Sequence, residues 1–211
     1  FGAYAVGPGQ STRPRVRPQV RLENALLEED LTRFDCIFLC NVSRFTDEEA
    51  TALFGYVKAG GGLVVTLGDQ VQPGSYNTYL GGGEGGRRIL PARLVEVAAT
   101  DPYYLDPRQY RHPIVAPFAD HERSGLLTTP VWKYLRVEPY DPASAQVALS
   151  FTNGDPAIVE HRVQRGRCIL LTTAAAPDSM DRSSEPPRPW TALATWPSFP
   201  PLVQEMLALA V

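Results

Sequence analysis

The sequence has few cysteines, no long apolar run and no excess of positive charge, and each absence excludes a class of protein. Three cysteines in 211 residues are too few for the disulfide framework of a small secreted domain. No apolar run approaches the ~20 residues that span a bilayer, and nothing at the start resembles a signal peptide. The net charge of −3, with both signs interspersed, lacks the basic stripe that nucleic-acid binding requires. We therefore expect neither nucleic acid as a partner nor direct insertion of this segment into a membrane.

The cysteines are predicted to be unpaired. Cys36 and Cys40 are four residues apart on one apolar run, which as a strand separates their Cα atoms by roughly 13 Å. A disulfide requires less than about 7 Å between Cα atoms, so these two cannot pair with each other. Cys168 lies in another apolar run. Because free cysteine is most often a core residue, we interpret all three as buried, inert thiols.

The most informative stretch that is present runs from residue 45 to 71. Thr46 and Glu49 form a capping box at the start of a helix with one apolar face, and the Gly60–Gly62 triplet ends that helix. Leu63–Leu67 follows as a strand buried on both faces, and Phe34–Val42 precedes the helix as a second, almost continuously apolar strand. Strand, helix and strand in this order predict a right-handed βαβ unit inside a parallel sheet.

The remaining segments are placed around this unit as one domain of residues 1–211. Residues 1–30 are an N-terminal extension or a truncated first βα unit, with an edge strand over Val16–Leu22 and a short helical turn over Asn24–Asp30. Pro73–Arg88 is glycine-rich but lacks the Walker pattern, so it is predicted to be a flexible surface connection. Residues 131–173 alternate with period two and predict a β-meander, whereas Pro177–Pro200 reads as a long loop before a final helix over Leu202–Ala210. Since the sequence has no initiator methionine, we expect a segment of a longer protein.

A ligand site, if present, is expected at the carboxyl ends of the two parallel strands. In sheets of this kind, binding crevices form beyond these ends. The residues that follow the strands and form the candidate crevice are Asn41, Ser43, Arg44, Gly68, Asp69 and Gln70. The alternative reading is structural, with Asp69 capping the next turn and Arg44 as a surface charge.

Several pieces together resemble a known family. They are Asp35–Val42, Tyr56–Asp69, Gly154–Thr173 and Trp196–Glu205, within a likeness that spans Leu31–Val211. In order and composition they resemble the class I glutamine amidotransferase-like domains of large bacterial membrane-anchored proteins, which often also have Bat-type or von Willebrand factor A-like regions. The resemblance implies an α/β fold, a flavodoxin-like three-layer sandwich with a mostly parallel sheet and the added antiparallel meander. It also implies a soluble domain whose partners are other domains of the same or a larger membrane-anchored protein.

The residues that give this family its chemistry are absent. Its members place a cysteine nucleophile on a tight elbow after a strand, and here that elbow falls at Leu67–Gln70, with Gly68 or Asp69 in the cysteine's place. The family's late His-Pro-Glu corresponds here to Trp196-Pro197-Ser198. No catalytic residue can therefore be transferred, and we expect a non-catalytic scaffold for interaction or regulation.

Two other functions stay open. A thiol hydrolase could use Cys40 as a relocated nucleophile, with His112, His121 or His161 as its base, although none of these lies at a diagnostic spacing. A small-ligand-binding module could use the candidate crevice. Aromatic residues in the loops suggest either a protein-docking surface or loop packing: Tyr76, Tyr79, Tyr103, Tyr104, Trp190 and Trp196.

No cofactor and no metal site are predicted. The acidic and histidine residues between positions 101 and 122 are scattered through loops without His-x-x-x-His or paired-cysteine spacing. They are Asp101, Asp106, His112, Asp120, His121 and Glu122.

Overall fold

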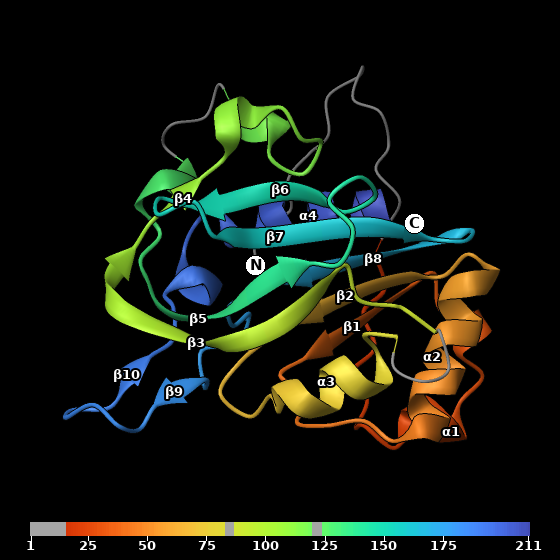
Figure 1. The fold of residues 1–211 in the computed structure, drawn as a ribbon. Coiled ribbons are helices and arrows are strands. Elements are labelled where there is room, and N and C mark those ends of the chain that lie inside the picture. Colours follow the sequence, from red (N-terminus) through yellow and green to blue (C-terminus); the bar gives the residue numbers. More distant parts are fainter. Residues whose placement is uncertain (1–15, 83–86, 120–123) are drawn as a thin grey trace.

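The computed structural model describes residues 16–82, 87–119 and 124–211, and a six-stranded mixed sheet lies at its centre (Figure 1). The strand order in this sheet is β1-β2-β8-β7-β6-β4. Its strands are β1 (Cys36–Cys40), β2 (Gly62–Thr66), β8 (Gly166–Leu171), β7 (Pro156–Val163), β6 (Gln146–Phe151) and β4 (Leu105–Asp106). Two further pairs form separate two-stranded sheets: β3 (Ala92–Tyr103) with β5 (Val131–Pro139), and β9 (Met180–Asp181) with β10 (Arg188–Pro189).

The α-helices in the described part of the chain are α1 (Ala25–Glu28), α2 (Asp47–Ala59), α3 (Pro73–Tyr79) and α4 (Phe199–Ala210). Short 3₁₀ turns are η1 (Leu31–Arg33), η2 (Arg108–Tyr110), η3 (Ala116–Phe118), η5 (Leu126–Thr128) and η6 (Leu193–Thr195). No helix within these residue ranges is long and apolar enough to cross a membrane.

The predicted βαβ unit is confirmed. The Thr46 side chain accepts the Glu49 N–H, and the Glu49 carboxylate accepts the Thr46 N–H, so both halves of the capping box are present at the start of α2. Gly60, with φ of 120°, ends the helix in a backbone conformation that residues with a side chain rarely adopt. β1 and β2 pair in parallel, and every residue of β2 is buried.

Two helices cover opposite faces of the sheet. Alternate residues of a strand point to opposite faces. Leu63 and Val65 of β2 belong to the same core cluster as Leu53 and Val57 of α2. Val64 belongs instead to the cluster that contains Leu202, Met206 and Ala210 of α4, which lies behind the sheet in the view of Figure 1. The α/β class predicted from the sequence is therefore correct.

The prediction of a mostly parallel sheet is wrong. β1, β2 and β8 run parallel, but β8–β7, β7–β6 and β6–β4 are antiparallel pairs. β8, the apolar strand after the last turn of the predicted meander, pairs directly with β2. The meander strands therefore continue the central sheet. β1 was expected inside the sheet, yet among the described residues it is one of the two edge strands, opposite β4, and only Leu39 of its five residues is buried.

Four segments differ from their predictions. Residues 131–138 were assigned to the meander, but β5 pairs with β3 in a separate ribbon. Pro73–Arg88 was predicted to be a flexible connection, but its first part is α3, in which the buried Tyr76 donates its hydroxyl to the Val42 carbonyl at 2.6 Å. Val16–Leu22 forms no strand. Pro177–Pro200 contains β9, β10 and η6, and α4 begins three residues earlier than predicted because Pro200 and Pro201 fit the first helical turn.

Candidate functional site

Asn41 organises the carboxyl ends of β1 and β2. Its backbone adopts φ of 54°, a left-handed conformation that asparagine tolerates better than most residues. Its side-chain oxygen accepts the Gln70 N–H at 3.1 Å, and its amide nitrogen donates to Asp69 at 2.9 Å and to Ser179 Oγ at 3.2 Å. Asn41 thus connects the turn after β2 to a segment near the end of the chain.

Gly68 packs against the side chain of Asn41. A Cβ at position 68 would lie 2.3 Å from Asn41 Oδ1 and 2.7 Å from Ser179 Oγ, both far inside van der Waals contact. A side chain at position 68, where the amidotransferase family has its elbow residue, would therefore displace the Asn41 amide and the Ser179 hydroxyl from their hydrogen bonds.

Asp69 has no free carboxylate oxygen. Oδ1 accepts from Asn41 at 2.9 Å, while Oδ2 accepts from Arg182 at 2.8 Å. Burial alone would raise the pKa of Asp69, but its interactions with Asn41, Arg182 and the Met180 backbone outweigh burial and hold the pKa below its usual value. We call these interacting residues the clasp: Asn41, Gly68, Asp69, Gln70, Ser179 and Arg182.

The other predicted crevice residues lie near the clasp without joining it. The Ser43 carbonyl accepts the Gln72 N–H at 2.9 Å, and Arg44 is exposed. Neither side chain hydrogen-bonds to the clasp in the part of the chain that the structure describes. Ser179 and Arg182 were missed from the sequence, because they lie in the segment interpreted as a loop and no local pattern connects them to Asp69.

A second ion pair holds the segment that contains Ser179 and Arg182 in place. Lys133 of β5 contacts Asp181 of β9 at 2.7 Å, and the hydrogen bond from Lys133 leads the interactions that lower the pKa of Asp181 to about 2. The residues after β8 are therefore tied both to the carboxyl ends of the parallel strands and to the β3–β5 ribbon.

The clasp makes a prediction about stability. Asp69→Asn replaces one acceptor oxygen with an NH₂ group that must face a donor of Asn41 or Arg182, so we expect a loss of about 1–2 kcal/mol in the free energy of unfolding. Arg182→Ala should cost less than about 1 kcal/mol, because the Arg182 side chain is 75% exposed. Because the pKa of Asp69 is lowered in the folded state, its contribution is present above the unfolded pKa of about 3.9 and is lost as the pH falls through the folded value. Urea unfolding of the unmodified protein and both variants between pH 3 and 7 measures the two losses and their dependence on pH. Equal losses of stability in the two variants would contradict a buried clasp.

The residues in the place of the family's His-Pro-Glu serve packing. Ser198 is buried, and its hydroxyl lies 3.3 Å from the Thr129 hydroxyl, while the Trp196 indole N–H donates to Thr128 Oγ1 at 3.4 Å. These contacts fasten the loop after η5 to the start of α4. They supply neither a base nor an orienting acid at the clasp.

The cysteines and histidines do not form a catalytic pair among the described residues. Although Cys40 as a whole is exposed, desolvation of its thiol raises its pKa, and burial raises the pKa of Cys36 to about 12. His161 donates Nε2–H to the Ile89 carbonyl at 2.6 Å, and its burial lowers its pKa. His112 lies 3.6 Å from the buried Glu160. His121 lies outside the described residues.

No group of three or more His, Cys, Asp or Glu side chains gathers as a possible metal site within residues 16–82, 87–119 and 124–211. The candidates Asp120, His121 and Glu122 lie outside these ranges. Asp106 accepts the Arg108 N–H, and His112 pairs with Glu160, so these two have other structural partners.

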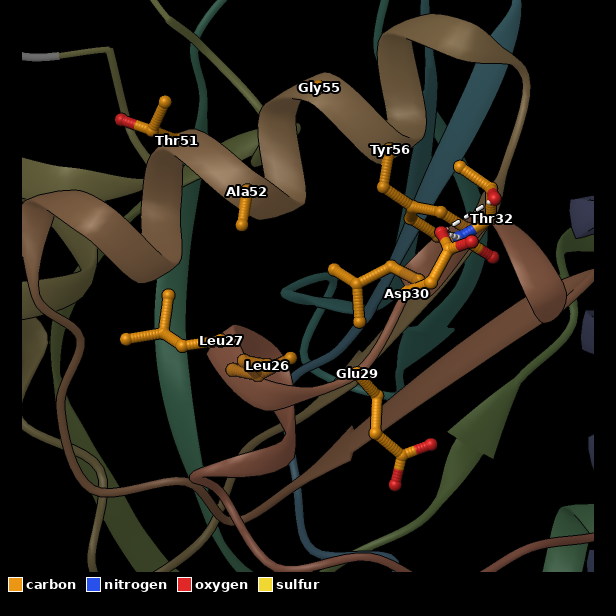
Figure 2. A pocket seen from close by; sticks show the side chains of 10 residues that line it. Leu26, Leu27, Glu29, Asp30, Thr32, Thr51, Ala52, Gly55 and Tyr56 are labelled. Carbon is orange, nitrogen blue, oxygen red and sulfur yellow. Dashed lines mark hydrogen bonds between the residues drawn. The ribbon is translucent and has the colours of Figure 1, made fainter.

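A shallow pocket of about 350 Å³ lies between α1, η1 and α2, away from the predicted crevice (Figure 2). Its apolar lining includes Leu26, Leu27 and Tyr56. The Asp30 carboxylate at its rim already accepts the Thr32 N–H and hydroxyl, as the dashed lines in Figure 2 show. The pocket has the volume of a ligand site, but it lacks the convergent free polar groups that orient a ligand.

Comparison with known proteins supports the fold and leaves the function open. No protein-family model matches the sequence, and no curated protein matches it significantly. The structure resembles two cytoplasmic proteins of Salmonella typhimurium. The likeness to STM3548 covers 90% of this chain and 76% of that one at 18% identity, with a TM-score of 0.65. The likeness to STM1381 covers 85% of this chain and 73% of that one at 15% identity, with a TM-score of 0.61.

A cold-adapted β-galactosidase from Rahnella sp. R3 is also similar in fold. The likeness covers 85% of this chain but only 24% of the enzyme, at 14% identity and a TM-score of 0.53. At identities this low, the likeness in all three cases shows a shared fold and nothing about shared chemistry.

Proposed function

We propose that this chain is a non-catalytic, amidotransferase-like domain that serves as an interaction or regulatory scaffold within a larger envelope-associated bacterial protein. The parallel neighbours β1, β2 and β8, with α2 and α4 on opposite faces, support a single domain of flavodoxin-like three-layer architecture. On this proposal the domain is soluble, its partners are other domains of the same or a larger membrane-anchored protein, and it needs no cofactor.

The state of Asp69 is the observation on which the proposal depends. At the place where an amidotransferase exposes its nucleophile, this chain has a glycine and a carboxylate whose two oxygens accept hydrogen bonds from Asn41 and Arg182. The Asp69 side chain is only 9% exposed. A carboxylate with its lone pairs engaged in this way is poorly suited to attack a substrate or to accept a proton from one.

The alternative of a thiol hydrolase rests on Cys40, which lies at the carboxyl end of β1. A nucleophilic cysteine needs a lowered pKa or a nearby base. The pKa of Cys40 is raised, and the two described histidines have other partners. These observations favour the scaffold.

The alternative of a small-ligand module rests on the candidate crevice. Asn41 and Asp69 direct their polar groups to each other and to Ser179 and Arg182, which leaves the exposed Arg44 and Gln70 side chains for a ligand. Two exposed side chains by themselves support only weak binding.

Cysteine reactivity and turnover together test the proposal. We expect no release of ammonia from glutamine and no ester hydrolysis above the rate of the Cys40→Ala variant. Alkylation of Cys40 in the folded protein should be slow at neutral pH and should keep accelerating above pH ~8.5, the ordinary cysteine pKa, because desolvation raises its own pKa. Mass spectrometry resolves each thiol. Rapid alkylation of Cys40 well below pH ~8, together with turnover that Cys40→Ala abolishes, would establish the hydrolase instead.

A further inference from the structure

The backbone groups on the outer edge of β1 have no hydrogen-bond partner within residues 16–82, 87–119 and 124–211. Gly62 N–H donates to the Asp35 carbonyl, and Asn41 N–H donates to the Thr66 carbonyl. Asp35 and Asn41, which flank β1, therefore turn their backbone groups toward β2, as do the odd-numbered residues between them. Successive residues of a strand alternate in direction, and Cys36, Phe38 and Cys40 therefore turn theirs away from β2. No described residue forms a backbone hydrogen bond with these three.

This edge lacks the features that usually prevent strand-to-strand association. Proteins protect free edges with proline, lysine, inward charges or bulges. β1 contains none of these over its five residues, and its pairing with β2 has continuous register. Cys36 and Phe38 are half-buried, and Cys40 is exposed, on the face of the sheet where α4 packs. A strand of this kind is a template for another strand.

The sequence of β1 is nearly symmetric about its centre. It reads Cys-Ile-Phe-Leu-Cys, with Phe38 in the middle and apolar residues of similar size on both sides. A two-fold interface requires such self-complementarity, because residue i of one copy meets residue j of the other and the reverse. Antiparallel pairing about Phe38 also places Asp35 opposite the partner's Asn41, so that no two like charges face each other.

We propose that two copies of this chain associate through β1, in antiparallel register about Phe38, to form one continuous sheet. The three outward-facing residues of each copy then exchange about six backbone hydrogen bonds. Each Cys36 lies opposite the partner's Cys40 on the same face, with Cα atoms about 5.5 Å apart, within the range of a disulfide. This inference is independent of the proposed function, because a catalytic domain could pair in the same way.

The natural cysteines report the register directly. Full-length protein in reducing buffer should sediment as a dimer at micromolar concentration. After mild oxidation with copper phenanthroline, peptide mapping should find an intermolecular Cys36–Cys40 disulfide, while Cys168 stays reduced because it is buried in the core. The two cysteines within one chain are too far apart to produce the same cross-link.

Two matched lysine variants test the surface. Cys40→Lys puts a charge on an exposed position of the edge and should weaken dimerisation about tenfold or more, because the two-fold axis places two lysines in the interface. Leu27→Lys changes another exposed apolar side chain, on α1, and should leave the dimer unchanged. Far-UV circular dichroism checks that both variants stay folded.

Three results would overturn the proposal. The first is a monomer at all concentrations, including one whose β1 amides resist hydrogen exchange because another segment covers the edge. The second is a dimer lost in Leu27→Lys but not in Cys40→Lys. The third is a dimer whose oxidation yields only Cys36–Cys36 or Cys40–Cys40 links, since the register would then differ.

Discussion

Replacing Gly166 with alanine is expected to destabilise the protein by about 3 kcal/mol, the largest loss of any single methyl addition that we predict. Gly166 begins β8, and a Cβ there would lie 2.2 Å from the Val57 carbonyl oxygen and 2.4 Å from that of Gly61. Both are backbone atoms at the end of α2, so no side chain can rotate away. The helix and the strand must separate, and the core between them opens.

Gly55 provides the matched control. It lies within α2, and a Cβ at that position would meet no atom within 4 Å. Gly55→Ala should stabilise the protein by about 0.5–1 kcal/mol through helix propensity and a less flexible unfolded chain. Urea unfolding followed by circular dichroism measures both variants. If Gly166→Ala left the free energy of unfolding unchanged, the end of α2 could not lie as close to Gly166 as the structure places it.

Replacing Arg167 with methionine should cost about 3 kcal/mol, because it leaves a buried carboxylate without its main partner. Arg167 donates to Glu160 at 2.9 Å, and the Glu160 side chain is only 4% exposed. His112, at 3.6 Å from the other carboxylate oxygen, is the remaining neighbour. The same substitution at Arg93, whose 2.7 Å ion pair with Glu138 is exposed, should cost less than about 1 kcal/mol.

A double variant separates the cost of burial from the value of the pair. Replacing Glu160 with leucine together with Arg167→Met removes both charges, and most of the lost stability should return, since an apolar pair of similar size avoids desolvation. Chemical unfolding of the unmodified protein, the Arg167→Met and Glu160→Leu single variants and the double variant gives the coupling free energy between the two side chains. A double variant no more stable than Arg167→Met would show that Glu160 has a role besides pairing with Arg167.

The sequence alone determined the features that depend on neighbouring residues. The Thr46–Glu49 capping box, the Gly60 helix end and the fully buried β2 are all present as predicted, because each follows from local hydrogen bonding or from an uninterrupted apolar run. The meeting of Asn41 with Asp69 also followed from the order of elements, since carboxyl ends of parallel strands lie at one edge of a sheet.

Only the tertiary structure decided which strands pair and what occupies the crevice. Period-two alternation shows that residues 131–138 form a half-covered strand, but it cannot distinguish β3 from β6 as its neighbour. The glycine-rich stretch became partly helical because burial of Tyr76 and its hydrogen bond to Val42 outweigh weak helix propensity.

The clasp is the clearest case of long-range determination. Ser179 lies 138 residues from Asn41, and Arg182 lies 113 residues from Asp69. No pattern within a strand or helix encodes contacts at such separations, because they depend on the path of the whole chain. The sequence predicted a ligand site at the carboxyl ends of the strands, and in the folded chain Asn41 and Asp69 hydrogen-bond there to each other and to Ser179 and Arg182.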